Sequence, residues 1–385
     1  MESTRMKGPR RFLLGFLSLI LSLAAPLAVR AQLSPHTLGA GVQFQSYSLS
    51  EALGAKVATL TLLPVAYALP VGDRFDLELY GAYANGSVEK GGSTFTLQGP
   101  VDTRIRARYQ VSQWAILTAL VNIPTGNSTH DAGEAVVASA LSTDVLGFRE
   151  ANWGTGAAVT AGIATAHQAG DWGFGVGASY RLSNGFEPTE GTDITYQPGD
   201  EIRVRVGLDR NVGEGGKFTM GFTFRNFSED LYDEKNLFQA GNRFRFDMSY
   251  ALRAGRATWA LYAVDVWREA GDAFLDLVDP QGGIVGDTTL VVGSQNLLVL
   301  GINGSTPLGS TLRIRPSAEL RYQSREEDHG EGWIMGAGAD IPLRLSGSVD
   351  LFPRGKLLFG SLKAISGESE SLWGLELGFT LRWQN

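Results

Sequence analysis

Residues 101–111 read Val-Asp-Thr-Arg-Ile-Arg-Ala-Arg-Tyr-Gln-Val, and this stretch decides the fold. Its odd positions carry Val, Thr, Ile, Ala, Tyr and Val, whereas its even positions carry Asp, three Arg and Gln. Successive side chains of a β-strand point to opposite faces, so a period of two predicts a strand with one largely apolar face and one charged face. A strand of this kind fits a membrane barrel, in which one face meets lipid and the other meets the interior.

The same alternation recurs along the whole chain and predicts an all-β fold, a transmembrane antiparallel up-and-down β-barrel of about sixteen strands. Fourteen strands remain an alternative, in case the first or the fifteenth candidate is not a strand. The sixteen candidates are 38–49, 56–70, 74–85, 98–111, 114–124, 153–167, 171–183, 200–210, 217–227, 241–254, 257–268, 294–305, 311–323, 331–343, 347–360 and 371–383.

The connections alternate in length. Even-numbered strands are followed by short links such as 112–113 and 255–256, whereas the fullest links follow odd-numbered strands. These long links are 125–152, 184–199, 228–240, 269–293 and 324–330. Alternating tight turns and long loops are typical of an outer-membrane barrel with short periplasmic turns, long extracellular loops and both ends in the periplasm.

The N-terminus predicts export. Basic residues at positions 5, 7, 10 and 11 precede the apolar run 12–28, and small residues at 29 and 31 form a cleavage site. We therefore expect a signal peptide at 1–31, cut between Ala31 and Gln32, followed by the barrel at 32–385. A membrane-anchoring helix is the alternative, but the run is short for one. The expected localisation is the Gram-negative outer membrane, reached through the general secretory route.

Composition agrees with a barrel and excludes several other classes. The chain has 49 glycines, 10% aromatic residues and only 19% charged residues. It has no cysteine, so neither disulfides nor thiolate metal sites are available. Without residues 1–31, 28 basic residues stand against 39 acidic ones, which argues against nucleic acid as a partner.

All eight tryptophans fall at the ends of predicted strands. Indole rings prefer the two membrane interfaces, so we expect an aromatic girdle at each end of the barrel. The short-turn girdle would contain Trp114, Trp172, Trp259 and Trp383, and the long-loop girdle Trp153, Trp267, Trp333 and Trp373.

Arginines dominate the face predicted to point inward, because an arginine facing lipid at mid-depth costs about 2–4 kcal/mol. The candidates for setting ion selectivity are Arg104, Arg106, Arg108, Arg203, Arg205, Arg243, Arg245, Arg313 and Arg315. One interpretation is a water-filled, positively lined lumen that favours anions. The other is a closed wall of ion pairs, because acidic residues share the face: Asp102, Glu201, Asp209, Asp247, Glu319, Asp340 and Glu376.

Three further features bear on the lumen and the loops. The apolar stretch 135–141 predicts that loop 125–152 folds into the lumen as a constriction or lid, with packing on the rim as the alternative. The acidic loops 228–240, 269–293 and 324–330 are interpreted as hydrated surface charge rather than as sites for divalent cations. Asp265 falls on a lipid-facing side, so either a bulge shifts the register or the residue lies near the headgroups.

The sequence predicts neither an enzyme nor a cofactor. The four histidines, at 36, 130, 167 and 329, are scattered and lack metal-ligand spacing. Residues 181–185, Arg-Leu-Ser-Asn-Gly, faintly resemble outer-membrane phospholipases, but no histidine stands nearby to activate Ser183. We therefore expect no catalytic residue, no metal and no cofactor.

Residues 119–127, Ala-Leu-Val-Asn-Ile-Pro-Thr-Gly-Asn, resemble a strand end of the transporter family named for the meta-pathway of phenol degradation. The resemblance covers about 98–185 and implies an outer-membrane transporter of small, often hydrophobic compounds, similar in outline to the long-chain fatty-acid channels. Only a few residues separate position 31 from the first strand, so a fatty-acid-channel hatch is not expected. The last strand resembles the signal recognised by the barrel-assembly machinery, although Trp383 is followed by two more residues.

The leading hypothesis is therefore a channel or transporter for a small solute of unknown identity. A structural or adhesive barrel with a closed lumen is the alternative, and an outer-membrane hydrolase is the third class. The expected partners are outer-membrane lipid and lipopolysaccharide, together with the barrel-assembly machinery.

Overall fold

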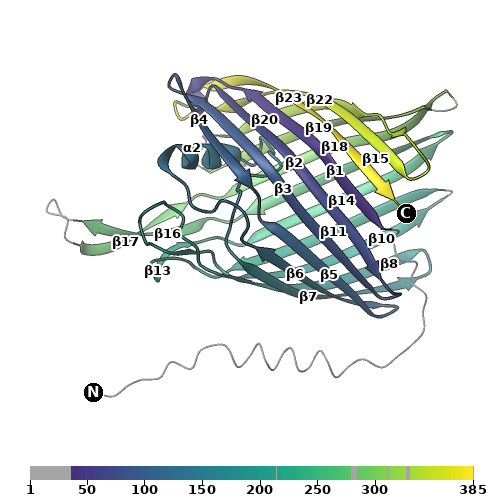
Figure 1. The fold of residues 1–385 in the computed structure, drawn as a ribbon, viewed down its shortest axis with the longest axis horizontal. Helices are drawn as coiled ribbons and strands as arrows, with labels where there is room; N and C mark the ends of the chain where they lie inside the picture. The colour runs from purple at the N-terminus through teal and green to yellow at the C-terminus, as the bar shows by residue number, and fades with distance from the viewer. Residues whose placement is uncertain (1–35, 214, 279–283, 310–311, 327–329, 385) are drawn as a thin grey trace, which may run out of the picture.

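The computed structural model describes residues 36–213, 215–278, 284–309, 312–326 and 330–384. The predicted signal peptide and its cleavage site lie outside these residues. The described chain forms one closed antiparallel barrel with sixteen strand positions, as predicted (Figure 1). The barrel closes where β1 (Thr37–Ser48) pairs along its whole length with β23 (Ser369–Gln384).

Consecutive barrel strands are neighbours throughout. Between β1 and β23 they are β2 (Val57–Val71), β3 (Phe75–Lys90), β5 (Thr103–Ser112), β6 (Ala115–Ile123), β7 (Ala158–Ala169), β8 (Trp172–Ser183), β10 (Glu201–Val212), β11 (Gly216–Phe227), β14 (Arg243–Ala254), β15 (Ala257–Arg268), β18 (Gln295–Leu308), β19 (Leu312–Arg325), β20 (Gly332–Asp340) and β22 (Val349–Lys363). Each of the sixteen predicted ranges overlaps one of these positions.

Two positions are divided into segments. The fourth position consists of β4 (Ser93–Pro100) and β5. β4 pairs with residues 83–90 of β3, and β5 pairs with residues 75–80. The break falls at Val101 and Asp102, whose backbone is not part of either strand. A short segment, β21 (Leu343–Arg344), likewise extends the position of β20 along β22.

The two faces of the barrel differ in chemistry. Apolar side chains such as Val204, Phe222 and Phe246 are exposed on the outer face, while the residues between them, such as Arg205, point inward. This is the arrangement of a barrel whose outer face meets hydrocarbon. Within the described residues, no helix is both long and apolar enough to cross a membrane.

Asp265 lies on the outer face without a bulge. The pairing of β15 with β14 and β18 is continuous, and Asp265 is flanked by Phe246 and Leu298. The same face of β15 carries the exposed Leu261 and Trp267. A register shift therefore does not explain this aspartate, which lies three residues from the long-loop end of its strand.

The long loops gather at one end of the barrel and the tight turns at the other (Figure 1). Three long loops form a second, five-stranded sheet that the alternation pattern did not reveal. We call it the rim sheet, and its strands are β9 (Tyr196–Gln197), β12 (Asp230–Tyr232), β13 (Lys235–Gln239), β16 (Gly271–Val278) and β17 (Ile284–Val292). A 3-10 turn, η1 (Glu51–Leu53), lies in the loop between β1 and β2.

Candidate functional site

The segment between β6 and β7 lies inside the barrel, and we call residues 125–155 the inserted loop. Its helix α2 (Ala132–Leu141) begins with a capping box, in which the Asp131 side chain accepts from the Glu134 amide and the Glu134 side chain accepts from the Asp131 amide. Val137 and Leu141 of α2 are buried against the inner faces of β2, β3 and β4. A side chain at Gly86 of β3 would collide with both, so this glycine makes room for the helix.

The neck of the inserted loop is held by one buried carboxylate. Asp102 accepts hydrogen bonds from the amide of Gly126 at 3.0 Å and from the amide of Thr155 at 2.8 Å, and thus joins the two ends of the loop. The Asn122 side chain also donates to Asp102, at 2.8 Å. The Thr125 hydroxyl accepts from the amide of Thr103, the first residue of β5, and donates to the carbonyl of Val101 in the break between β4 and β5. The Pro-Thr-Gly turn at 124–126 is therefore the base of the inserted loop.

The tip of the inserted loop reaches the far walls of the barrel. Asp144 pairs with Arg268 of β15 at 2.8 Å and accepts from the Gln295 side chain at 3.1 Å. The carbonyl of Leu146 accepts from the hydroxyl of Tyr47 at 2.6 Å. Leu146 is also part of a buried apolar cluster with residues of β20, β22 and β23. The loop is thus fixed at the base and at the tip.

A buried group of charges supports the tip. Arg321 of β19 donates to the carbonyl of Leu146 at 2.7 Å and pairs with Glu319 at 2.6 Å. Lys356 of β22 pairs with the same Glu319 at 2.6 Å, and Glu376 of β23 lies 3.7 Å from Arg321. These four side chains are 12–16% exposed. Because each charge has an opposite partner, the group can be buried without isolated charges.

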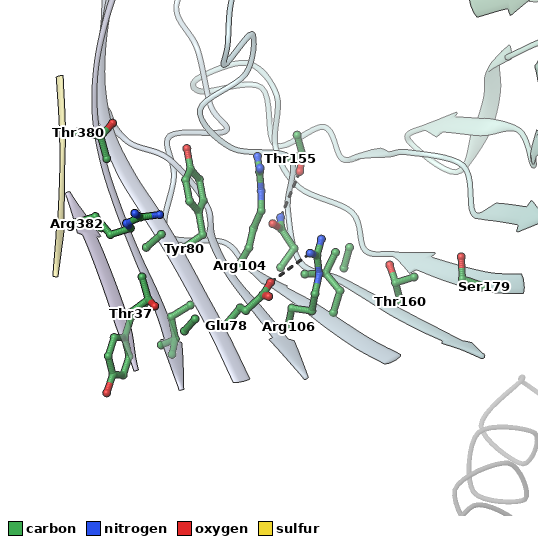
Figure 2. Close-up of a pocket in the computed structure, with 18 of the residues that line it drawn as sticks. Thr37, Glu78, Tyr80, Arg104, Arg106, Thr155, Thr160, Ser179, Thr380 and Arg382 are labelled. Carbon is green, nitrogen blue, oxygen red and sulfur yellow. Dashed lines mark hydrogen bonds and ion pairs between the residues drawn. The ribbon is translucent and has the colours of Figure 1, made fainter. Parts of the chain in front are cut away.

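Below the inserted loop the barrel encloses a cavity of about 960 Å³. Figure 2 shows side chains of β3, β5 and β23, among them Tyr80, Arg104 and Arg382, arranged around it. Seven arginines and three carboxylates line the cavity, so its wall is basic. The arginines are Arg104, Arg106, Arg181, Arg203, Arg315, Arg354 and Arg382, and the acids are Glu78, Glu201 and Asp340.

The first three predicted arginines, on β5, are neutralised by acidic residues. Arg104 pairs with Glu150 of the inserted loop at 3.2 Å, and Arg106 pairs with Glu78 of β3 at 3.3 Å. Arg108 pairs with both Asp76 and Glu78, each at 2.6 Å. The closed-wall interpretation therefore describes this part of the barrel well.

The other six predicted arginines also point inward, but their partners differ. Arg203 pairs with Glu201 at 2.6 Å, while Arg205 and Arg245 share Asp247 at 2.9 and 3.6 Å. The remaining three have no carboxylate partner among the described residues. Arg243 lies over the ring of Phe227, Arg315 lies over that of Phe352, and Arg313 donates to Ser305.

Residues that the alternation pattern did not single out complete the site. Arg354 of β22 lines the cavity, and Asp76, Glu78 and Glu150 supply the charges that pair with β5. Asp76 and Glu78 alternate within one predicted strand, so they could have been assigned to the inner face. Glu150 could not, because its position depends on the path of the inserted loop.

Seven of the eight tryptophans lie in or next to the ends of the barrel strands, but Trp153 does not belong to a girdle. Its side chain is fully buried inside the barrel, and its Nε1 donates to the carbonyl of Ala84 at 3.2 Å. The prediction failed because β7 begins only at Ala158. Residues 153–157 precede the strand and connect the inserted loop to it. Trp153 packs against Val137 and Leu141 rather than against lipid.

Two titratable groups near the long-loop end have shifted pKa values. Burial lowers the pKa of His130, against the opposing effect of Glu134 and Asp131. In the rim sheet, burial and the hydrogen bond to Asp230 raise the pKa of Tyr196.

Ser183, at the end of β8, donates a hydrogen bond to the backbone carbonyl of Gly199. Among the described residues, no three His, Cys, Asp or Glu side chains are grouped to hold a metal ion.

No family model matches the chain, and no curated protein matches it. Solved structures with a similar course of the chain include a TodX monoaromatic hydrocarbon channel deltaS2 mutant, with 9% identity, 91% of this chain and 90% of that chain covered, and a TM-score of 0.47. A bacterial polysaccharide outer membrane secretin has 11% identity, 90% and 98% coverage and a TM-score of 0.45. The CymD monoaromatic hydrocarbon channel has 11% identity, 100% and 95% coverage and a TM-score of 0.44. The sequence identities and TM-scores are too low to assign a family. The resemblance to the meta-pathway family is not confirmed.

Proposed function

We propose that this protein is an outer-membrane channel that passes small solutes through its lumen and prefers anions. The observation that carries the proposal is the cavity of about 960 Å³ inside a closed barrel, with more arginines than carboxylates on its wall. A barrel of sixteen strands is wide enough for an aqueous interior. Charged side chains around such an interior set which ions enter.

The inserted loop would set the size limit. It occupies the long-loop half of the lumen, where α2 covers one wall and the tip crosses to β15 and β19. Because both its neck and its tip are tied to the wall, the loop acts as a fixed constriction in this proposal. Solutes would pass beside it and then enter the basic cavity below.

The test is conductance of the purified barrel in planar lipid bilayers. We expect discrete channel openings and, in a potassium chloride gradient, a reversal potential that shows preference for chloride. The same measurement is made on a variant in which a short Gly-Ser linker replaces residues 128–152 and the neck residues Asp102, Gly126 and Thr155 are kept. This variant should conduct more and pass larger solutes. A folded barrel that is silent in both forms would contradict the channel function.

A structural barrel with a closed lumen is the second candidate. The neck beside β5 and the pair of Asp144 with Arg268 of β15 favour it, because they fasten the loop to two distant parts of the wall. In that case the intact protein would be silent, and only the variant lacking residues 128–152 would conduct. The two functions therefore give different results in the same experiment.

The cellular setting is part of the proposal. The exposed apolar face would lie in outer-membrane lipid, with lipopolysaccharide around the long loops. The final strand, β23, carries alternating apolar residues up to Trp383 and would be read by the barrel-assembly machinery after general secretory export. Detection of the protein in isolated outer membranes, and its loss when assembly is depleted, would test both points.

A further inference from the structure

Four arginines stand side by side on the inner wall near the long-loop end. Arg203 of β10 is the register partner of Arg225 of β11, Arg225 is the partner of Arg243 of β14, and Arg243 is the partner of Arg268 of β15. We call these four residues the arginine row. Neighbouring strands lie about 4.8 Å apart, so the row is about 14 Å long.

The row faces the lumen. Apolar residues next to it in sequence, such as Ile202 and Trp267, are exposed on the outer face, and alternation therefore places the arginines inside. The side chains of Arg203, Arg225 and Arg268 remain 43%, 32% and 33% exposed. These three side chains are thus partly accessible from the lumen, and Arg243 is half-buried.

The row is short of negative charge. Like charges directly opposite each other on neighbouring strands are destabilising, so four adjacent arginines need compensation. Glu201 pairs closely with Arg203, at 2.6 Å, but lies 3.8 Å from Arg225. At the other end Asp144 of the inserted loop pairs with Arg268 at 2.8 Å. Among the described residues, no carboxylate pairs with Arg243, which lies over the ring of Phe227.

The arginines of β5 show that this excess of arginines over carboxylates is local. There, Arg104, Arg106 and Arg108 are matched by Glu150, Glu78 and Asp76. In the arginine row two carboxylates serve four arginines, and both lie at the ends. The centre of the row, between Arg225 and Arg243, therefore carries net positive charge that the 3.8 Å pair of Arg225 with Glu201 compensates only in part.

We propose that the centre of the arginine row binds small solutes that carry two or more oxyanion charges. Guanidinium groups donate pairs of parallel hydrogen bonds to carboxylate or phosphate oxygens, and adjacent guanidinium groups can hold two charges of one solute. The ligand class is thus small dicarboxylates and phosphate compounds. The site deepens the proposed channel function, on which its role in transport rests, by assigning the solute class.

The row also borders the inserted loop. Asp144 occupies its β15 end, so a solute at Arg225 and Arg243 would lie beside the tip of the loop. The site therefore lies beside the inserted loop. The row also borders the cavity, because Arg203 at its other end lines the cavity wall.

The first test is binding to the folded barrel in detergent, which needs no conductance. Titration calorimetry would use inorganic phosphate and succinate as probes, with acetate as the single-charge comparison. The variant Arg225→Gln with Arg243→Gln should bind phosphate and succinate about tenfold more weakly or worse, because charge-assisted hydrogen bonds are lost. The control is Arg253→Gln with Arg313→Gln, which removes the same charge from inward positions near the short turns and should bind like the parent.

Thermal unfolding separates a binding role from a purely structural one. Without oxyanions, R225Q/R243Q should unfold at a higher temperature than the parent, because repulsion within the row is relieved. Phosphate should raise the unfolding temperature of the parent and of R253Q/R313Q, but not that of R225Q/R243Q. A lower unfolding temperature for R225Q/R243Q without oxyanions, or equal phosphate binding by all three proteins, would overturn the proposal.

Conductance then distinguishes the proposed channel function from the proposed oxyanion site in the arginine row. If the channel conducts, succinate added on the long-loop side should reduce the current through the parent more than through R225Q/R243Q. If the barrel is silent but binds succinate through the row, the site stands and the channel function fails. If the barrel conducts and succinate neither binds nor blocks, the channel stands and the site is rejected.

Discussion

The amide of Gly126 donates a hydrogen bond to Oδ1 of Asp102 at 3.0 Å, while Oδ2 of the same carboxylate accepts from the amide of Thr155. One side chain from the wall thereby closes the base of a loop of about thirty residues. A side chain at Gly126 would collide with the carbonyl of Trp153, so the neck admits only glycine. The inserted loop is consequently positioned by its base as well as by its packing.

Replacing Asp102 with Ala should destabilise the barrel by about 2–4 kcal/mol, because several buried donors lose a charged acceptor. The inserted loop should also become sensitive to protease. Urea unfolding in lipid vesicles and limited proteolysis measure the two effects. Glu89→Ala is the control, because its pair with Lys56 is exposed and should contribute less than about 1 kcal/mol. Equal losses in the two variants would show that the neck is not held by Asp102.

Trp153 should be shielded from lipid. In proteins that retain one tryptophan, with the other seven changed to Phe, brominated phospholipids should quench Trp373 strongly and Trp153 weakly. Trp373 is 59% exposed on the outer face, whereas Trp153 is fully buried inside the barrel. Quenching of Trp153 to the same extent as Trp373 would place it at the lipid interface after all.

Asp265→Leu should stabilise the barrel by about 1 kcal/mol, because an acidic side chain near the end of a lipid-facing strand is mildly unfavourable. Asp265→Asn should give part of the gain, since it removes the charge and keeps the shape. Urea unfolding in vesicles of defined thickness measures both. Destabilisation by the leucine variant would instead indicate that Asp265 has a polar partner in the membrane.

The inserted loop should loosen in mild acid through His130. Burial lowers the pKa of this residue, so the folded state favours the neutral ring. Its contribution to stability is complete above the ordinary histidine pKa of about 6.5 and is lost as the pH falls below it towards the lowered value. Protease cleavage of the loop should therefore increase between neutral pH and pH about 5 in the parent, and less so in His130→Gln. The same increase in both proteins would assign the effect to other groups.

The barrel itself was predictable because lipid and lumen impose opposite chemistry on alternate residues. All sixteen strand positions follow from that alternation, including β10 and β23, whose two faces differ most clearly. The rim sheet did not show the pattern, since its shortest strands have only two or three residues. The start of β7 was placed too early, because residues 153–157 continue the alternation although they belong to the neck.

The site was only partly predictable, because the cross-strand neighbours of each arginine depend on the register between strands. The inward orientation of Arg203 and Arg243 follows from their own strands. Their alignment with Arg225 and Arg268 does not, because it depends on where the turns and loops between four strands place each residue. In the same way, nothing within residues 101–111 reveals that Glu150 returns from a distant loop to pair with Arg104.

The closure of β1 on β23 has a consequence for the order of folding. Thr37 is paired with Gln384, so the last seam of the barrel joins the two ends of the described chain. Closing so long a segment is entropically costly and makes such contacts late. The tip of the inserted loop packs across this seam, because Leu146 contacts Tyr47 on one side and belongs to the same cluster as Leu372 on the other. Docking of the loop tip should therefore be among the final steps of assembly, and protection of the loop from protease would report when the barrel has closed.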